Sequence, residues 1–108
     1  MEVSPIEASI IEAQVIEAIR TVYDPEIPVN IYELGLVYDV EVEPDGFVTV
    51  RMTLTSPGCP AAQSLPVEVD AKVRAVPGVT DANVEVVWDP PWSMEMMSDE
   101  AKLELGLF

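Results

Sequence analysis

The residues best suited to chemistry lie in the stretch Thr53-Leu54-Thr55-Ser56-Pro57-Gly58-Cys59-Pro60-Ala61-Ala62, which holds the single cysteine of the chain. A strand-like alternation ends here, Pro57 and Gly58 indicate a tight loop, and Pro60 suits the first position of a helix. We therefore expect Cys59 at or beside a helix N-cap. Unpaired N–H groups and the positive end of the helix dipole favour a thiolate there, which predicts a pKa below the free value of about 8.5.

Two other interpretations of Cys59 stay open. Many lone cysteines are small buried apolar residues, and a capping role resembling that of asparagine is a third option. The chain contains no histidine, which excludes Ser/His/Asp and Cys/His arrangements and the usual imidazole ligands of zinc. We therefore expect no enzyme; a thiol enzyme would have to use Asp24 or Glu26 as its base.

A second group of polar residues lies in the segment from Tyr23 to Gly35. Its two prolines, Pro25 and Pro28, forbid a regular helix or central strand, while its apolar content predicts an ordered, packed loop. Asp24 and Glu26 bracket Pro25, and such carboxylates can bind a hard or borderline metal ion. The commoner role of an Asp-Pro pair is to form a turn or cap a helix.

Composition restricts the classes of partner. The 108 residues predict one domain, 1–108, in which 88–108 form a tail rich in Trp, Pro and Met. Five Lys and Arg against 20 Asp and Glu give a net charge of −15, so we expect neither nucleic acid nor a membrane as partner. The lone cysteine excludes an internal disulfide, and without a signal-peptide pattern or a long apolar run we expect a cytoplasmic protein.

The predicted elements would position these residues on a small α+β fold. Ser4-Pro5-Ile6-Glu7 has the pattern of a capping box, and the helix it starts is predicted to reach Val22. A buried stripe is expected at Ile6, Ile10, Ala13, Ile16 and Ile19.

Strands follow over residues 36–43 and 47–54, joined by a hairpin turn at Pro44-Asp45-Gly46. A helix over residues 61–76, with a kink or break at Pro66, should bury Leu65, Val69, Val73 and Val76. The third strand is expected over residues 83–88, parallel to the second, with a short helix between Ser98 and Leu105. The fold class is thus a three-stranded mixed sheet with two main helices, in the order α-β-β-α-β plus a short C-terminal helix.

The predicted tail places two tryptophans across a Pro-Pro pair. Trp88, Trp92 and Met96 fit a flap over the edge of the core, and they fit equally well a surface for a partner or a second copy. A homodimer is therefore one of the arrangements we consider.

Four motifs succeed one another along the chain: Asp24-Pro25-Glu26-Ile27-Pro28-Val29-Asn30-Ile31, Leu34-Gly35-Leu36-Val37-Tyr38, Met52-Thr53-Leu54-Thr55-Ser56-Pro57-Gly58-Cys59-Pro60 and Trp88-Asp89-Pro90-Pro91-Trp92. In this order they resemble the SufT/PaaD-like family of iron–sulfur maturation proteins. The resemblance covers the chain from about Val15 to its end, and the C-terminal motif is most similar to the SUF-associated branch.

The resemblance implies a small α/β protein that assists iron–sulfur cluster assembly and delivery to client apo-proteins. The family's reactive cysteine falls on Cys59, its acidic motif on Asp24 and Glu26, and the polar positions before the cysteine on Thr55 and Ser56. It further implies that a transient iron–sulfur cluster or iron is the cargo, with nothing stably bound, and that assembly proteins and clients are the partners.

The number of ligands limits what such a site can hold. Clusters usually take four cysteine ligands, whereas one chain offers one and a dimer offers two. Bound iron or cluster would need ligands from carboxylates, a small thiol or a client. The alternative hypothesis is an adaptor that binds no metal and links the assembly machinery to its clients.

Overall fold

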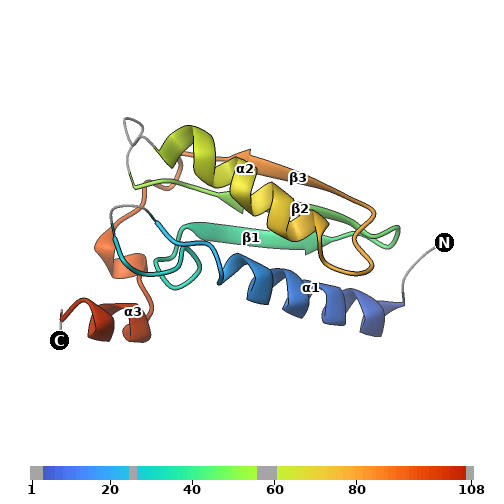
Figure 1. The fold of residues 1–108 in the computed structure, drawn as a ribbon, viewed down its shortest axis with the longest axis horizontal. Helices are drawn as coiled ribbons and strands as arrows, with labels where there is room; N and C mark the ends of the chain where they lie inside the picture. The colour runs from blue at the N-terminus through green and yellow to red at the C-terminus, as the bar shows by residue number, and fades with distance from the viewer. Residues whose placement is uncertain (1–3, 25–26, 56–60, 107–108) are drawn as a thin grey trace.

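The computed structural model describes residues 4–24, 27–55 and 61–106 and has an α+β fold in which two helices cover one face of a three-stranded sheet (Figure 1). The elements are α1 (Pro5–Ile19), β1 (Val37–Val42), β2 (Phe47–Met52), α2 (Ala61–Arg74), β3 (Asp81–Val86), a 3₁₀ turn η1 (Met94–Met96) and α3 (Asp99–Glu104). The predicted order of elements is therefore confirmed, while η1 was not predicted. No helix within the described ranges is long and apolar enough to cross a lipid bilayer.

The start of α1 follows the predicted cap. The Ser4 hydroxyl oxygen accepts the Glu7 N–H at 3.1 Å, and Pro5 occupies the first helical position. The helix ends at Ile19, three residues before the predicted end at Val22. A tight turn follows, in which the Val22 N–H donates to the Ile19 carbonyl.

The predicted buried stripe of α1 is wrong. Ile6 and Ile10 are 74% and 52% exposed, Ala13 is exposed and Ile16 is only half-buried, so Ile19 alone of the five belongs to the core. Aliphatic residues occur on more than one side of this helix, so their spacing allows two stripes, and packing against the sheet selects one. The residues of α1 that are buried are Ile11, Val15 and Ile19.

The sheet has the order β1-β2-β3, with β1 antiparallel and β3 parallel to the central strand β2, as predicted. The hairpin turn lies at residues 44–46, where Gly46 has a φ of +89°. Strand β3 begins two residues earlier than predicted and ends at Val86, which leaves Trp88 beyond the sheet. The two added residues, Asp81 and Ala82, pair with Phe47 and Val48 of β2, and Arg74 also contacts both of them.

Helix α2 runs without interruption through Pro66, at which a kink or break was expected. Its predicted core positions are confirmed, since Leu65, Val69 and Val73 are buried and Val76 is 8% exposed just beyond the helix. They pack with the buried stripe of α1 and with the inward side chains of β2, which are Val48, Val50 and Met52. This core fixes the ends of the strands that carry the candidate site.

Candidate functional site

Several helices and strands begin or end at the same end of the sheet. The last residues of β2 and β3, the first turn of α2, the end of α1 and the segment that follows it all lie at this end (Figure 1). Open sheets usually keep their sites beyond the carboxyl ends of their strands. We therefore take this end as the candidate functional site.

Asp24 belongs to a narrow loop whose base is closed by backbone hydrogen bonds. The Ile31 N–H donates to the Val22 carbonyl at 2.9 Å, and Tyr23 pairs with Asn30 as an isolated antiparallel bridge. Asp24 is only 5% exposed, and its Oδ1 accepts the Ile27 N–H at 3.0 Å. The carboxylate thus holds its own loop in shape, as expected for an acidic residue before a proline.

Substitutions of Asp24 separate this structural role from a role for its charge. We expect Asp24→Ala to lower the free energy of unfolding by about 1–2 kcal/mol, because the half-buried Ile27 N–H loses its acceptor. Asp24→Asn retains a side-chain oxygen, so we expect a loss of about 1 kcal/mol or less. Urea denaturation of both variants checks this, and equal losses would show that the charge and not the acceptor stabilises the loop.

Of the other residues of the predicted site, Thr55 alone lies within the described ranges. Glu26, Ser56 and Cys59 lie outside the described residues, so their distances to Asp24 stay untested. Thr55 is described and is half-buried three residues beyond the end of β2. In the described ranges, no three Asp, Glu, Cys or His side chains come close enough together to hold a metal ion.

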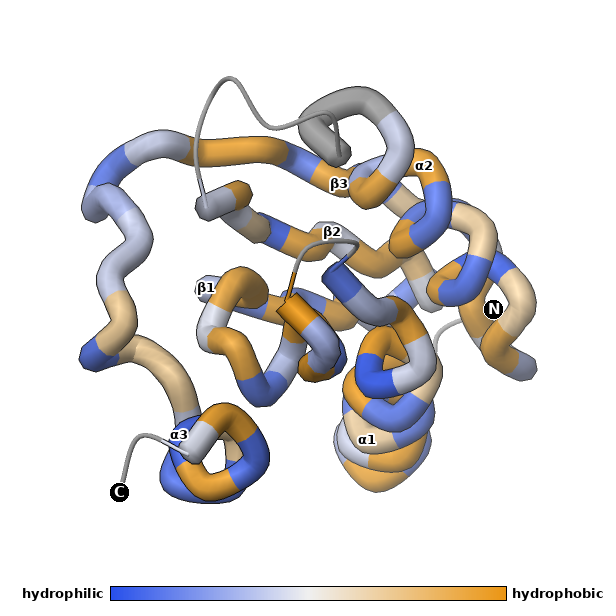
Figure 2. The backbone as a smooth tube through the Cα atoms, turned by 60° about the vertical axis from the view of Figure 1, so that its left-hand side comes forward, coloured by the Kyte–Doolittle hydropathy of each residue, from blue (hydrophilic) through white to orange (hydrophobic). Residues whose placement is uncertain are grey.

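Residues 87–98, which we call the C-terminal strap, cross this end of the sheet on the side away from α1 and α2 (Figure 2). Hydrogen bonds fasten the strap to the segment before β1 and to β1 itself. Tyr38 donates its hydroxyl to the Pro90 carbonyl at 2.8 Å, Trp92 donates its indole N–H to the Leu34 carbonyl at 2.7 Å, and the Ser98 N–H donates to the Glu33 carbonyl at 2.8 Å. The strap then continues into α3, whose cap at Ser98 was predicted.

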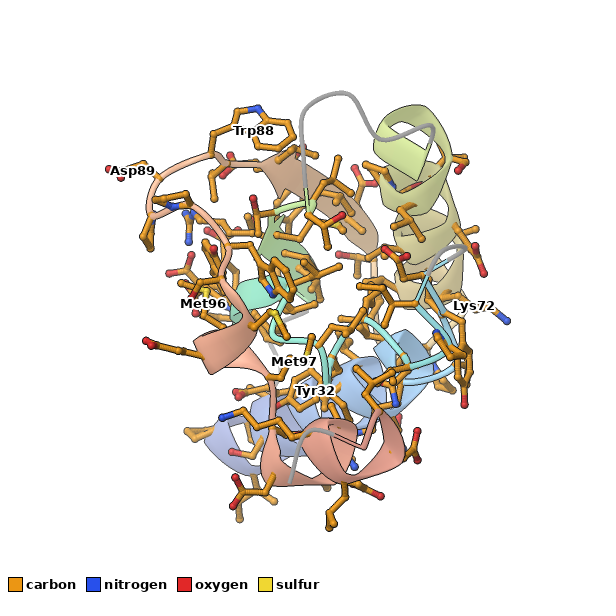
Figure 3. All side chains as sticks on the ribbon, turned by 90° about the vertical axis from the view of Figure 1, so that its left-hand side faces the viewer. Tyr32, Lys72, Trp88, Asp89, Met96 and Met97 are labelled. Carbon is orange, nitrogen blue, oxygen red and sulfur yellow. The ribbon has the colours of Figure 1, made fainter. Side chains whose placement is uncertain are left out.

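The three predicted interaction residues of the strap have different surroundings. Trp92 is half-buried against the core, and Met96 is half-buried with its sulfur 3.5 Å from the Tyr38 hydroxyl. Trp88 is 45% exposed at the outer end of the strap, away from Met96 and Met97 (Figure 3). Whether any of them contacts a partner stays a prediction.

Tyr38, which the strap contacts, lies close to Thr53, and the sequence did not reveal either residue as part of the site. Burial raises the pKa of the Tyr38 phenol, with a smaller opposing effect from the Thr53 hydroxyl. Thr53 is fully buried, and its Oγ1 meets no partner with hydrogen-bond geometry within the described chain, although it lies close enough to the Tyr38 hydroxyl to affect the pKa of the phenol. A Tyr in one strand and a Thr just after another give no sequence signal for this, because the strap that contacts Tyr38 arrives from residues far along the chain.

The buried Thr53 hydroxyl leads to a stability prediction. A buried hydroxyl without a partner costs about 1–3 kcal/mol, so the isosteric Thr53→Val is expected to raise the free energy of unfolding by about 1 kcal/mol. Thr53→Ser keeps the hydroxyl and removes a methyl group, for an expected loss of about 1 kcal/mol. Thermal denaturation of both variants tests this, and a less stable Thr53→Val would show that the hydroxyl has a partner in solution.

Comparison with known proteins identifies the family to which the chain belongs. Residues 12–86 match the model of a protein family described as iron-sulfur cluster assembly protein. The chain belongs to this family. The matched range includes the Asp24 loop, both strands of the hairpin and the Cys59 segment, and the strap lies beyond it.

Individual members of the family align over most of their length. An Fe-S protein maturation auxiliary factor of Porphyromonas gingivalis is 54% identical over 95 residues, which are 88% of this chain and 90% of the relative. The Fe-S protein maturation auxiliary factor SufT of Staphylococcus aureus is 45% identical over 86 residues, which are 80% of this chain and 98% of the relative. The resemblance to the SufT branch seen in the sequence motifs is thereby confirmed.

A solved structure supports the fold in the same way. The crystal structure of a domain of unknown function, DUF59, from Bacillus anthracis superimposes with a TM-score of 0.89 at 39% identity. The match covers 97% of this chain and all of the other. The α+β fold of the chain is therefore the fold of this family member.

Proposed function

We propose that the protein assists the maturation of iron–sulfur proteins by handling iron or a cluster transiently through the thiolate of Cys59. The observation that carries the proposal is the family match over residues 12–86, which includes the single cysteine. The named relatives, both maturation auxiliary factors, support the general role. Under this proposal the cluster is cargo and the protein is not an enzyme.

The local chain supports a reactive role for Cys59. Helix α2 has 14 residues and begins at Ala61, two positions after the cysteine. The start of a helix of this length presents unpaired N–H groups and a positive potential, which favour a thiolate. A thiolate is the form that binds iron and attacks disulfides.

Transient binding agrees with the ligands that the chain offers. One cysteine supplies one of the four thiolates that a cluster usually takes, so the rest would come from carboxylates such as Glu26, a small thiol, a second copy or a client. Asp24 contributes in this proposal chiefly by shaping the loop before Glu26, because its Oδ1 already accepts the Ile27 N–H. Incomplete ligation favours the release of cargo to a client that supplies more cysteines.

An adaptor that binds no metal is the second candidate. Trp88 and Met94 favour it, since they are 45% and 53% exposed on the strap, and Trp and Met are common in protein interfaces. In this case assembly proteins and clients would contact the strap, and Cys59 would serve packing only.

Anaerobic reconstitution with iron and sulfide distinguishes the two candidates. We expect the wild type, with a small thiol present, to show cluster absorbance and bound iron that transfer to an apo-ferredoxin, and Cys59→Ser to lose both. Ser64→Ala, at an exposed serine of α2 outside the predicted site, serves as a control and should retain the absorbance. Equal iron binding by wild type and Cys59→Ser, with both well folded by circular dichroism, would contradict the proposal and favour the adaptor.

A further inference from the structure

Helix α1 carries an apolar stripe that the fold does not use. Ile6, Ile10 and Ala13 follow one another at steps of four and three residues and are all exposed, whereas the buried stripe lies on another side of the helix. Ile6 is 74% exposed, so its side chain contributes little hydrophobic stabilisation to the folded protein. Exposed aliphatic residues in a row mark a surface for another molecule more often than scattered ones do.

Ile10, in the middle of this stripe, lines a groove between α1 and the end of α2. Ile10, Gln14 and the Pro77-Gly78 turn line a cavity of about 330 Å³. A second cavity, of about 420 Å³, continues from Gln14 and Pro77 toward Thr21, with Ala18, Ala75 and Val76 on its walls. Together they form one groove, which we call the α1–α2 groove. It extends along α1 to Thr21, which precedes Asp24 by three positions in the sequence.

The charge of the groove restricts its occupant. Glu7 and Glu17 line it, Lys72 is its one described cation, and the whole chain has a net charge of −15. Lys72 extends away from the body of the protein (Figure 3), so it leaves the floor of the groove apolar. Two copies of so acidic a chain repel each other, whereas a segment bearing Lys or Arg is attracted.

We propose that the α1–α2 groove binds a segment of a partner protein that carries aliphatic side chains flanked by Lys or Arg. The aliphatic side chains cover Ile10, Ala18 and Val76, and the basic side chains lie near Glu7 and Glu17. Binding at this groove does not depend on cluster handling. A partner held there reaches the end of the molecule where β2 and β3 end, which would bring a bound protein to the candidate site.

A designed peptide pair tests the proposal with the full-length protein. The probe is a helical peptide of about 18 residues made of Leu and Lys with the leucines on one face. The control peptide has the same lysines and serine in place of every leucine. Fluorescence anisotropy gives the dissociation constants, and ¹⁵N NMR shift changes locate the site.

Matched variants supply the decisive comparison. Ile10→Gln is expected to weaken binding of the Leu/Lys peptide roughly tenfold, the effect of losing most of one buried aliphatic side chain. Val67→Gln, at a 68% exposed valine of α2 that does not line the groove, should change it less than about twofold, and Cys59→Ser should leave it unchanged.

Three results would overturn the proposal. One is equal affinity for the serine control peptide, which would mean that charge alone attracts the probe. Another is the same loss in Val67→Gln as in Ile10→Gln. The third is a stable dimer in sedimentation velocity that Ile10→Gln dissociates, since a second copy would then occupy the groove. Because the readout is peptide affinity, failure here leaves the test of Cys59 intact, and failure of that test leaves this one intact.

Discussion

Gly35→Ala is expected to lower the free energy of unfolding by about 3 kcal/mol or more, a large share of the stability of a domain of this size. Gly35 has a φ of +81°, a conformation that costs an alanine about 1 kcal/mol. A methyl group at this position would also overlap the carbonyl oxygen of Met96 and lie 2.8 Å from its carbonyl carbon. Both atoms belong to backbone, so the clash is relieved only if the strap moves.

Gly106→Ala is the matched control for this substitution. Gly106 also has a positive φ, of +72°, but a methyl group there would meet no atom within 4 Å. We expect Gly106→Ala to lower the free energy of unfolding by about 1 kcal/mol, which is the cost of placing an alanine at a positive φ. Urea denaturation of both variants measures the difference, and equal losses would mean that the strap does not pack against Gly35 in solution.

Displacement of the strap in Gly35→Ala should also change the hydrogen bonds and the fluorescence of the strap residues. In Gly35→Ala the Tyr38–Pro90 and Trp92–Leu34 hydrogen bonds should lengthen or break, since both join the strap to the residues around Gly35. Trp92 fluorescence should then shift to longer wavelength as the indole becomes hydrated. Unchanged fluorescence in a destabilised variant would place the strain elsewhere.

Local sequence signals predicted the elements of the fold well. Ser4 caps α1, Ser98 caps α3, and Pro44-Asp45-Gly46 forms the hairpin turn, because each of these features depends on residues within three or four positions. The core side of α2 was predicted for the same reason, since one face of this helix is clearly more apolar than the other. The parallel pairing of β2 and β3 followed from the intervening helix.

The sequence could not predict features that depend on distant parts of the chain. The side of α1 that is buried is decided by the sheet, and with isoleucine on several sides the spacing alone favoured the wrong stripe. The requirement for glycine at position 35 comes from the Met96 backbone, 61 residues later, and no local pattern carries it. The chemistry at Asp24 was partly predicted, since an Asp before Pro commonly accepts a hydrogen bond from its own turn.

The two tryptophans of the strap also look alike in the sequence and differ in the structure. Both flank the Pro-Pro pair, yet Trp92 packs against the core and donates to the Leu34 carbonyl, whereas Trp88 is 45% exposed. Composition identified them together as candidates for a flap or an interface. Their positions show that Trp92 fastens the strap and that Trp88 has a surface available to a partner.

Trp92→Ala is therefore expected to lower the free energy of unfolding by about 3 kcal/mol, the lower end of the range for a large aromatic residue, because Trp92 is only half-buried. Trp88→Ala should lower the free energy of unfolding by about 1 kcal/mol or less, because the Trp88 side chain is already 45% exposed to solvent. Trp92→Phe keeps part of the packing and lacks the N–H donor, so its stability should fall between those of the wild type and Trp92→Ala.

The same pair tests how the strap contributes to function. If Trp88 contacts assembly proteins or clients, Trp88→Ala should reduce cluster delivery to an apo-ferredoxin while leaving the protein folded at the assay temperature and its iron binding in isolation unchanged. Trp92→Ala should reduce delivery only at temperatures where the protein begins to unfold, because its effect passes through the fold. Equal delivery by Trp88→Ala and wild type would remove the exposed tryptophan from the interface. A loss in Trp92→Ala well below its unfolding temperature would mean instead that the position of the strap is itself needed for delivery.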